Sequence, residues 1–126
     1  ATIRFKADTV ANEQLANTAK LQDDDASNFG ADFYTGGYGN LWDLLDNTQS
    51  ITLIEAFWTQ GKPVSAVCHA PIALVNAKDE NGEFIVKGRE VTGFTNEEEE
   101  AVGLTKIVPQ LVVDVMIERR ANYSKK

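Results

Sequence analysis

The segment Pro63–Pro71 constrains the fold more than any other part of the chain. It reads Pro-Val-Ser-Ala-Val-Cys-His-Ala-Pro, a short apolar run that leads directly into a helix start. Ala66 and Ala70 lie two residues before and after Cys68, and small flanking residues allow the backbone to turn sharply there. We therefore predict a buried strand, a tight turn with Cys68 at its apex, and a helix from about Ala70 to Ala77.

The remaining sequence predicts further strands and helices in alternation. A loop rich in glycine, residues 36–39, follows the first predicted strand, and Trp42 and Trp58 are predicted to lie in the core. The other predicted elements are a strand at Phe29–Thr35, a helix capped by Ser50 and ended by Gly61, a turn at Asn81-Gly82, a hairpin of Phe84–Val86 and Glu90–Phe94 around Lys87-Gly88, a helix capped by Thr95 or Asn96, and a last helix with Pro109 in its first turn.

This alternation predicts a single α/β domain over residues 1–126, with a mostly parallel sheet and helices on both faces. Ligands of such sheets bind beyond the carboxyl ends of the strands. The loops at Gly36 and at Cys68 both fall at such ends, so we expect them to meet at one site.

Composition narrows the classes of partner and setting. The 126 residues include 12 basic and 19 acidic side chains, a net charge of −7, which argues against binding to a nucleic-acid backbone. No apolar run approaches the ~20 residues that span a bilayer, and no leader sequence is visible. A single cysteine cannot form an internal disulfide, so we expect a reducing, cytoplasmic setting. From the net charge and the absence of a long apolar run, we expect neither a nucleic-acid partner nor a membrane partner.

Cys68 and His69 are the only cysteine and the only histidine, and they are adjacent. At a helix N-terminus Cys68 would be favoured as a thiolate, with His69 as its proton-transfer partner and the His69 N–H facing a developing oxyanion. The alternatives are a small buried cysteine and a histidine that merely begins a helix in solvent. One cysteine and one histidine do not make a closed zinc site, so no metal is expected.

Two other segments have both a structural and a functional interpretation. The run Glu97–Glu100 fits a capping box with Thr95 or Asn96, although one carboxylate turned inward would orient His69. The Gly36–Gly39 loop is either a simple turn or a source of backbone N–H groups for an anion pocket beside Cys68.

Together these residues resemble the ThiJ/PfpI superfamily, also described as class I glutamine-amidotransferase-like, and in particular its glyoxalase III and heat-shock-chaperone-like branch. The resemblance covers about Asp32 to Tyr123. The segments that carry it are Phe33–Gly39, Trp42–Leu44, Ala66–Pro71 and Val91–Glu99.

The resemblance implies a flavodoxin-like fold with Cys68 as nucleophile, His69 as its partner and Glu99 as the third, acidic member. Gly37, Tyr38 and the backbone of His69 would form the oxyanion and substrate pocket, although Tyr38 stands where the family commonly has histidine. It further implies that the chain is an internal fragment, lacking the opening strand–helix units, an acidic residue they carry, and the closing strand. We therefore expect a homo-oligomer or completion by another chain.

The implied activity is cysteine-dependent conversion of a 2-oxoaldehyde such as methylglyoxal to a 2-hydroxy acid, without a cofactor. The alternatives are a non-enzymatic stress protein (a redox sensor or holding chaperone), an inactive truncated relative, and a hydrolase that uses the same turn.

Overall fold

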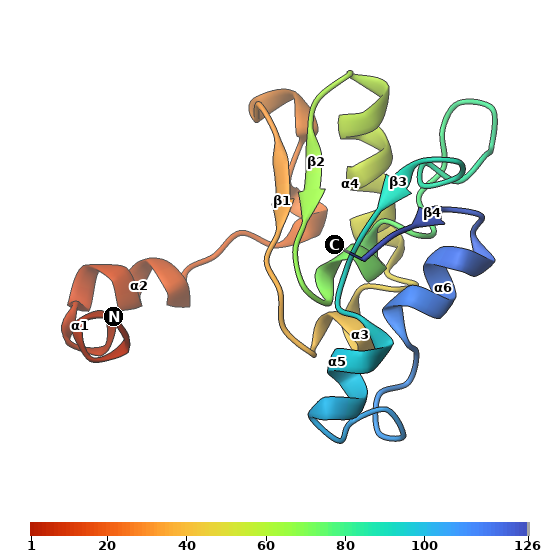
Figure 1. The fold of residues 1–126 in the computed structure, drawn as a ribbon. Coiled ribbons are helices and arrows are strands. Elements are labelled where there is room, and N and C mark those ends of the chain that lie inside the picture. Colours follow the sequence, from red (N-terminus) through yellow and green to blue (C-terminus); the bar gives the residue numbers. More distant parts are fainter. Residues whose placement is uncertain (126) are drawn as a thin grey trace.

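The computed structural model describes residues 1–125, in which helices pack beside short parallel strands (Figure 1). The elements, in chain order, are α1 (Thr2–Ala7), α2 (Thr9–Ala16), η1 (Leu21–Asp23), η2 (Ala26–Asn28), β1 (Asp32–Tyr34), α3 (Asn40–Asp43), α4 (Thr48–Thr59), β2 (Val64–Ala66), η3 (Ala70–Ala73), β3 (Glu90–Val91), α5 (Asn96–Ala101), α6 (Val112–Glu118) and β4 (Asn122–Tyr123).

The strands pair in parallel, as the alternating pattern predicts. β1 lies beside β2 with Tyr34 opposite Ala66, and β3 lies beside β4 with Val91 opposite Tyr123. The Phe94 N–H donates to the carbonyl of Cys68 at 2.8 Å, which ties the chain beyond β3 to the end of β2. The residues after β1, β2 and β3 are thereby collected at one end of the strands, where α3 and α5 lie (Figure 1).

The segment that begins with η3 is the centre of the core. Ile72 and Val75 pack in one buried cluster with residues of α3 and α6, whereas Ala73 and Ala77 pack in a second with Ile54 of α4. Neighbouring residues of this segment therefore pack in two different clusters. Its first residue, Ala70, is fully buried. The predicted Ala70–Ala77 helix is thus shorter, a 3-10 turn followed by non-helical turns.

Both ends of α4 are fixed by local hydrogen bonds. Gly61, with φ 66°, donates to the Trp58 carbonyl while Lys62 donates to Phe57, which confirms the predicted glycine stop. The predicted cap at Ser50 is wrong, because Asn47 caps the helix and accepts from the Ser50 N–H. Ser50 is instead fully buried, with its hydroxyl 2.8 Å from that of Tyr34.

The predicted hairpin around Lys87-Gly88 is also wrong. Glu90 and Val91 pair with β4, and the Gly88 N–H donates to the Arg120 carbonyl, so a distant segment replaces the local partner. The turn at Asn81-Gly82 is confirmed, closed by an isolated antiparallel bridge between Lys78 and Phe84.

The last helix begins later than its proline suggests. Leu111 is the N-cap of α6, so Pro109 precedes the helix instead of lying in its first turn. The apolar face is as expected, with Val112, Val115 and Met116 buried.

Several apolar side chains remain open to solvent. Helices α1 and α2 contain no buried residue and stand away from the body (Figure 1). Phe33 on β1 is 61% exposed. Trp42 is 56% exposed, so the prediction of Trp42 as a core residue is wrong. Trp58 packs against the second cluster. No helix within residues 1–125 has both the length and the apolarity to cross a membrane.

Candidate active site

The turn after β2 holds Cys68 in an unusual backbone conformation. Cys68 has a φ of 62°, one of two positive values among the non-glycine residues of the described chain. Such a conformation costs about 1–3 kcal/mol and persists where the surroundings impose it. The turn is held by the Ala70 N–H, which donates to Val67, and by the Phe94 N–H, which donates to Cys68. The predicted sharp turn is therefore present, with a partly exposed thiol at its apex.

Gly36 makes room for this turn. A Cβ at Gly36 would lie 2.8 Å from the Cβ of Cys68 and 3.2 Å from the Val67 carbonyl, closer than side-chain atoms approach. The loop after β1 and the turn after β2 thus touch at a position that only glycine fits. Gly37, the glycine named from the resemblance, has a φ of 125° and no heavy atom within 4 Å of its Cβ position.

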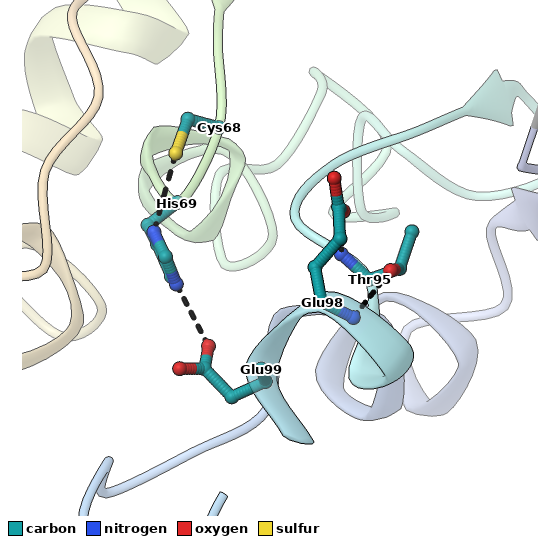
Figure 2. Close-up of polar contacts among 5 residues, drawn as sticks. All are labelled: Cys68, His69, Thr95, Glu98 and Glu99. Carbon is teal, nitrogen blue, oxygen red and sulfur yellow. Dashed lines mark hydrogen bonds and ion pairs between the residues drawn. The ribbon is translucent and has the colours of Figure 1, made fainter. Parts of the chain in front are cut away.

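His69 joins the cysteine to a carboxylate (Figure 2). Its Nδ1 lies 3.3 Å from the Cys68 Sγ, and its Nε2 lies 2.8 Å from Oε2 of Glu99. The imidazole is 1% exposed, so the interpretation of His69 as a solvent-facing helix start is wrong. With a proton on Nε2 donated to Glu99, Nδ1 is left free to accept the thiol proton.

The acidic run divides between a cap and a buried carboxylate. Thr95 and Glu98 form a capping box: the Glu98 N–H donates to Thr95 Oγ1 at 3.0 Å, and the Thr95 N–H donates to Glu98 Oε2 at 2.8 Å. Each helical residue turns by about 100°, so fixing Glu98 outside places Glu99 inside. Glu99 is 2% exposed, whereas its neighbours Glu97 and Glu100 are exposed.

Two aromatic rings enclose the imidazole. The Tyr38 and Phe94 ring centroids lie 4.2 and 4.1 Å from that of His69. Burial, and after it the Glu99 charge, raise the pKa of the Tyr38 hydroxyl. Oε1 of Glu99 is buried and has no hydrogen-bond partner in the described chain, whereas Oε2 contacts His69.

A cavity of about 380 Å³ opens on the other side of Cys68. Its lining includes Val67, Cys68, Thr92, Phe94 and Glu98. A larger cavity, about 590 Å³, lies between residues 21–26 and α4, and neither Cys68 nor His69 contributes to it. A small molecule in the cavity beside the thiol can therefore meet the nucleophile.

The structure adds residues that the sequence did not assign. Gly36 touches Cys68, Phe94 encloses His69, and Glu98 lines the cavity. Phe94 and Glu98 lie in the Val91–Glu99 segment singled out in the sequence, but the pattern contains no sign of which side chains face the cysteine. Within residues 1–125 no three His, Cys, Asp or Glu side chains are grouped as metal ligands.

This arrangement can perform nucleophilic chemistry. A thiol that passes its proton to an imidazole becomes the reactive thiolate, and a carboxylate on the far ring nitrogen stabilises the imidazolium that forms. The His69 N–H donates to no acceptor among the described residues, so it is free to bind an oxyanion beside Cys68.

Two curated proteins are identical to this chain at about a third of the aligned positions. "Glyoxalase 3" of Candida albicans is 34% identical over 98 residues, which are 77% of this chain and 42% of the relative. "General stress protein 18" of Bacillus subtilis is 35% identical over 95 residues, 75% of this chain and 49% of that relative. This chain therefore spans less than half the length of either of these curated relatives.

The fold comparison extends over nearly the whole chain. The crystal structure of glyoxalase III from Candida albicans superposes with a TM-score of 0.87 at 29% identity, covering 99% of this chain and 54% of that one. This similarity confirms the flavodoxin-like α/β fold. The model of the DJ-1/PfpI family matches residues 4–116. The chain therefore belongs to the DJ-1/PfpI family.

Proposed function

We propose that the protein containing this chain is a glutathione-independent glyoxalase, with Cys68 as nucleophile, His69 as proton carrier and Glu99 as the residue that orients His69. The single observation that carries the proposal is the continuous contact from Cys68 Sγ through both His69 nitrogens to buried Glu99. The relatives named as glyoxalases support the substrate class, a 2-oxoaldehyde.

The proposed reaction begins at the aldehyde. The Cys68 thiolate adds to the aldehyde carbon to form a hemithioacetal, whose oxygen is stabilised by the His69 backbone N–H, with Gly37 as a second donor. His69, which has taken the thiol proton, first gives it to this oxygen, and the neutral imidazole then takes the proton from this carbon and returns it to the neighbouring keto carbon. The hydroxyl proton passes to the former keto oxygen in the same rearrangement, which leaves a thioester beside a new hydroxyl group. Water hydrolyses the thioester, so the product is a 2-hydroxy acid and the thiol is restored. The proposal needs no metal and no cofactor.

Replacing the nucleophile tests this mechanism. We expect Cys68→Ser to abolish conversion of methylglyoxal to lactate, because a serine hydroxyl is a far weaker nucleophile at neutral pH. Lactate formation measures the activity, and thermal unfolding shows whether the fold is retained. Ala101→Ser, which places a hydroxyl at an exposed position outside the cavity lining, is the matched control. Turnover that survives in a folded Cys68→Ser protein would remove Cys68 from the mechanism.

A second function is favoured by one relative, the stress protein of Bacillus subtilis. A partly exposed thiol beside a histidine would also serve as a redox sensor, through oxidation to a sulfenic acid. Mass spectrometry after mild peroxide separates the two functions, because a sensor reacts with peroxide without turning over methylglyoxal.

A homo-oligomer and a cytoplasmic setting form part of the same proposal. The exposed apolar side chains Phe33, Trp42 and Val67 support association with a second copy.

A further inference from the structure

The cavity beside Cys68 has a mostly uncharged lining, in which Cys68 and Glu98 are the residues with ionisable side chains. Its other residues are small, apolar or neutral. Any molecule that reaches the thiol through this cavity therefore meets one carboxylate on the way. The buried Glu99 lies on the opposite side of the imidazole, so it does not line this approach.

The Glu98 carboxylate is held in place although the residue is exposed. Its Oε2 accepts from the Thr95 N–H, and its backbone N–H donates to Thr95 Oγ1, so the carboxylate and the backbone of Glu98 are each held by one bond to Thr95 (Figure 2). The same bond from the Thr95 N–H is the main reason that the pKa of Glu98 is lowered. At neutral pH the cavity therefore carries a fixed negative charge.

Nothing in the described lining neutralises this charge. An adjoining hollow, which shares Thr92, Gly93 and Glu98 with the cavity, contains Lys125. The ammonium of Lys125 is paired with Glu97 at 2.5 Å, so it is already engaged by another carboxylate. None of the ion pairs among residues 1–125 involves Glu98, so its charge is not paired with a cation of the protein.

We propose that Glu98 is a specificity-determining residue, which excludes anionic molecules from Cys68 and restricts the substrate to uncharged aldehydes. This inference rests on the proposed function in that Cys68 is the group the substrate must reach. It adds the substrate's charge class: a neutral 2-oxoaldehyde is accepted, whereas an aldehyde that bears a carboxylate, such as glyoxylate, is repelled. Because Glu98 is exposed, water and salt limit the range of its charge, so we expect a modest preference for uncharged molecules that grows as ionic strength falls.

Alkylation of the cysteine tests the charge filter without any turnover. Because Cys68 is the only cysteine, the rates with iodoacetamide, which is neutral, and iodoacetate, which is anionic, both report on this cavity. We expect Glu98→Gln to lower the ratio of the iodoacetamide rate to the iodoacetate rate roughly three- to tenfold. Glutamine still completes a capping box, so the helix start is retained.

Glu100→Gln is the matched control. It removes the same charge from the same helix, but Glu100 is exposed, accepts from Thr105 and lies outside the cavity lining. We expect its rate ratio to stay within about twofold of wild type. Equal changes in the two variants would overturn the proposal, because the effect would then come from net charge alone.

Salt provides a second measurement that needs no folded variant. In wild type the rate ratio should fall as ionic strength rises to about 1 M, because an exposed charge is screened there. A ratio that is insensitive to salt would overturn the proposal. Different results would contradict the two hypotheses. If the ratio of the iodoacetamide rate to the iodoacetate rate depends on Glu98 but methylglyoxal is not turned over, the proposed glyoxalase activity is contradicted. If methylglyoxal and glyoxylate are turned over equally, the proposed role of Glu98 is contradicted.

Discussion

Cys68 lies between a buried group of side chains and an open cavity. On one side His69 and Glu99 are 1% and 2% exposed, and aromatic rings cover the imidazole. On the other side the cavity is open, Val67 is 49% exposed and Glu98 faces solvent. Two consecutive glutamates of one short helix thus occupy opposite environments.

This difference in burial predicts that the two glutamates have different effects: Glu99 on the reactivity of the Cys68 thiol, and Glu98 on which molecules reach it. A buried carboxylate acts strongly on a neighbouring histidine, because little water screens it, whereas an exposed carboxylate acts weakly and over a short range. Variants of the buried side should therefore change the rates with all reagents by the same factor. Variants of the open side should change which reagents are preferred.

The largest effect is expected for Glu99→Gln. An amide nitrogen opposite Nε2 favours the wrong tautomer of His69, so Nδ1 no longer accepts the thiol proton. Methylglyoxal turnover should fall roughly 100-fold or more, and alkylation by iodoacetamide and iodoacetate should slow equally. Glu100→Gln serves as the control here too. A change confined to one of the two alkylating reagents would contradict the assignment of Glu99 to the reactive side.

Gly36→Ala should have the next largest effect. The new methyl group would lie 2.8 Å from the Cys68 Cβ, so the turn must move, at a cost of about 1–3 kcal/mol in the free energy of unfolding. Denaturant unfolding measures this loss, and alkylation by both reagents should change in parallel. Gly30→Ala is the matched control, since a Cβ there meets nothing within 4 Å. Equal stability losses in the two variants would show that the contact with Cys68 is not the cause.

Tyr38→Phe should have the smallest effect, because it keeps the ring against His69 and removes only the hydroxyl. The pKa of this hydroxyl is raised in the folded state, chiefly by burial and then by Glu99, from a reference of 10.0. Its contribution to stability is thus complete below pH 10 and is lost as the pH rises above it. The variant should lose less stability than wild type as the pH rises above 10 in thermal unfolding. Identical pH profiles would show that neither burial nor Glu99 raises the pKa of this hydroxyl.

Much of the local structure could be predicted from short-range chemistry. The sharp turn at Cys68, the glycine stop at Gly61, the turn at Asn81-Gly82 and the cap at Thr95 each depend on a few neighbouring residues. Such features are set by backbone geometry and nearby hydrogen bonds, so the sequence is sufficient. The resemblance to a known family then selected Glu99, where the pattern of four glutamates left the choice open.

The tertiary structure decided what depends on distant partners. Glu90 and Val91 looked like half of a hairpin, yet they pair with β4, because a parallel partner 32 residues away satisfies their backbone groups. Ser50 is buried because the Tyr34 hydroxyl meets it, and Gly36 matters because Cys68 reaches it from another strand. The sequence by itself determined that a cysteine would stand at a strained turn beside a histidine. The residue pattern left the four glutamates equivalent, and only packing places Glu99 behind that pair and Glu98 at the open cavity, because all four have the same chemistry and differ only in what surrounds them.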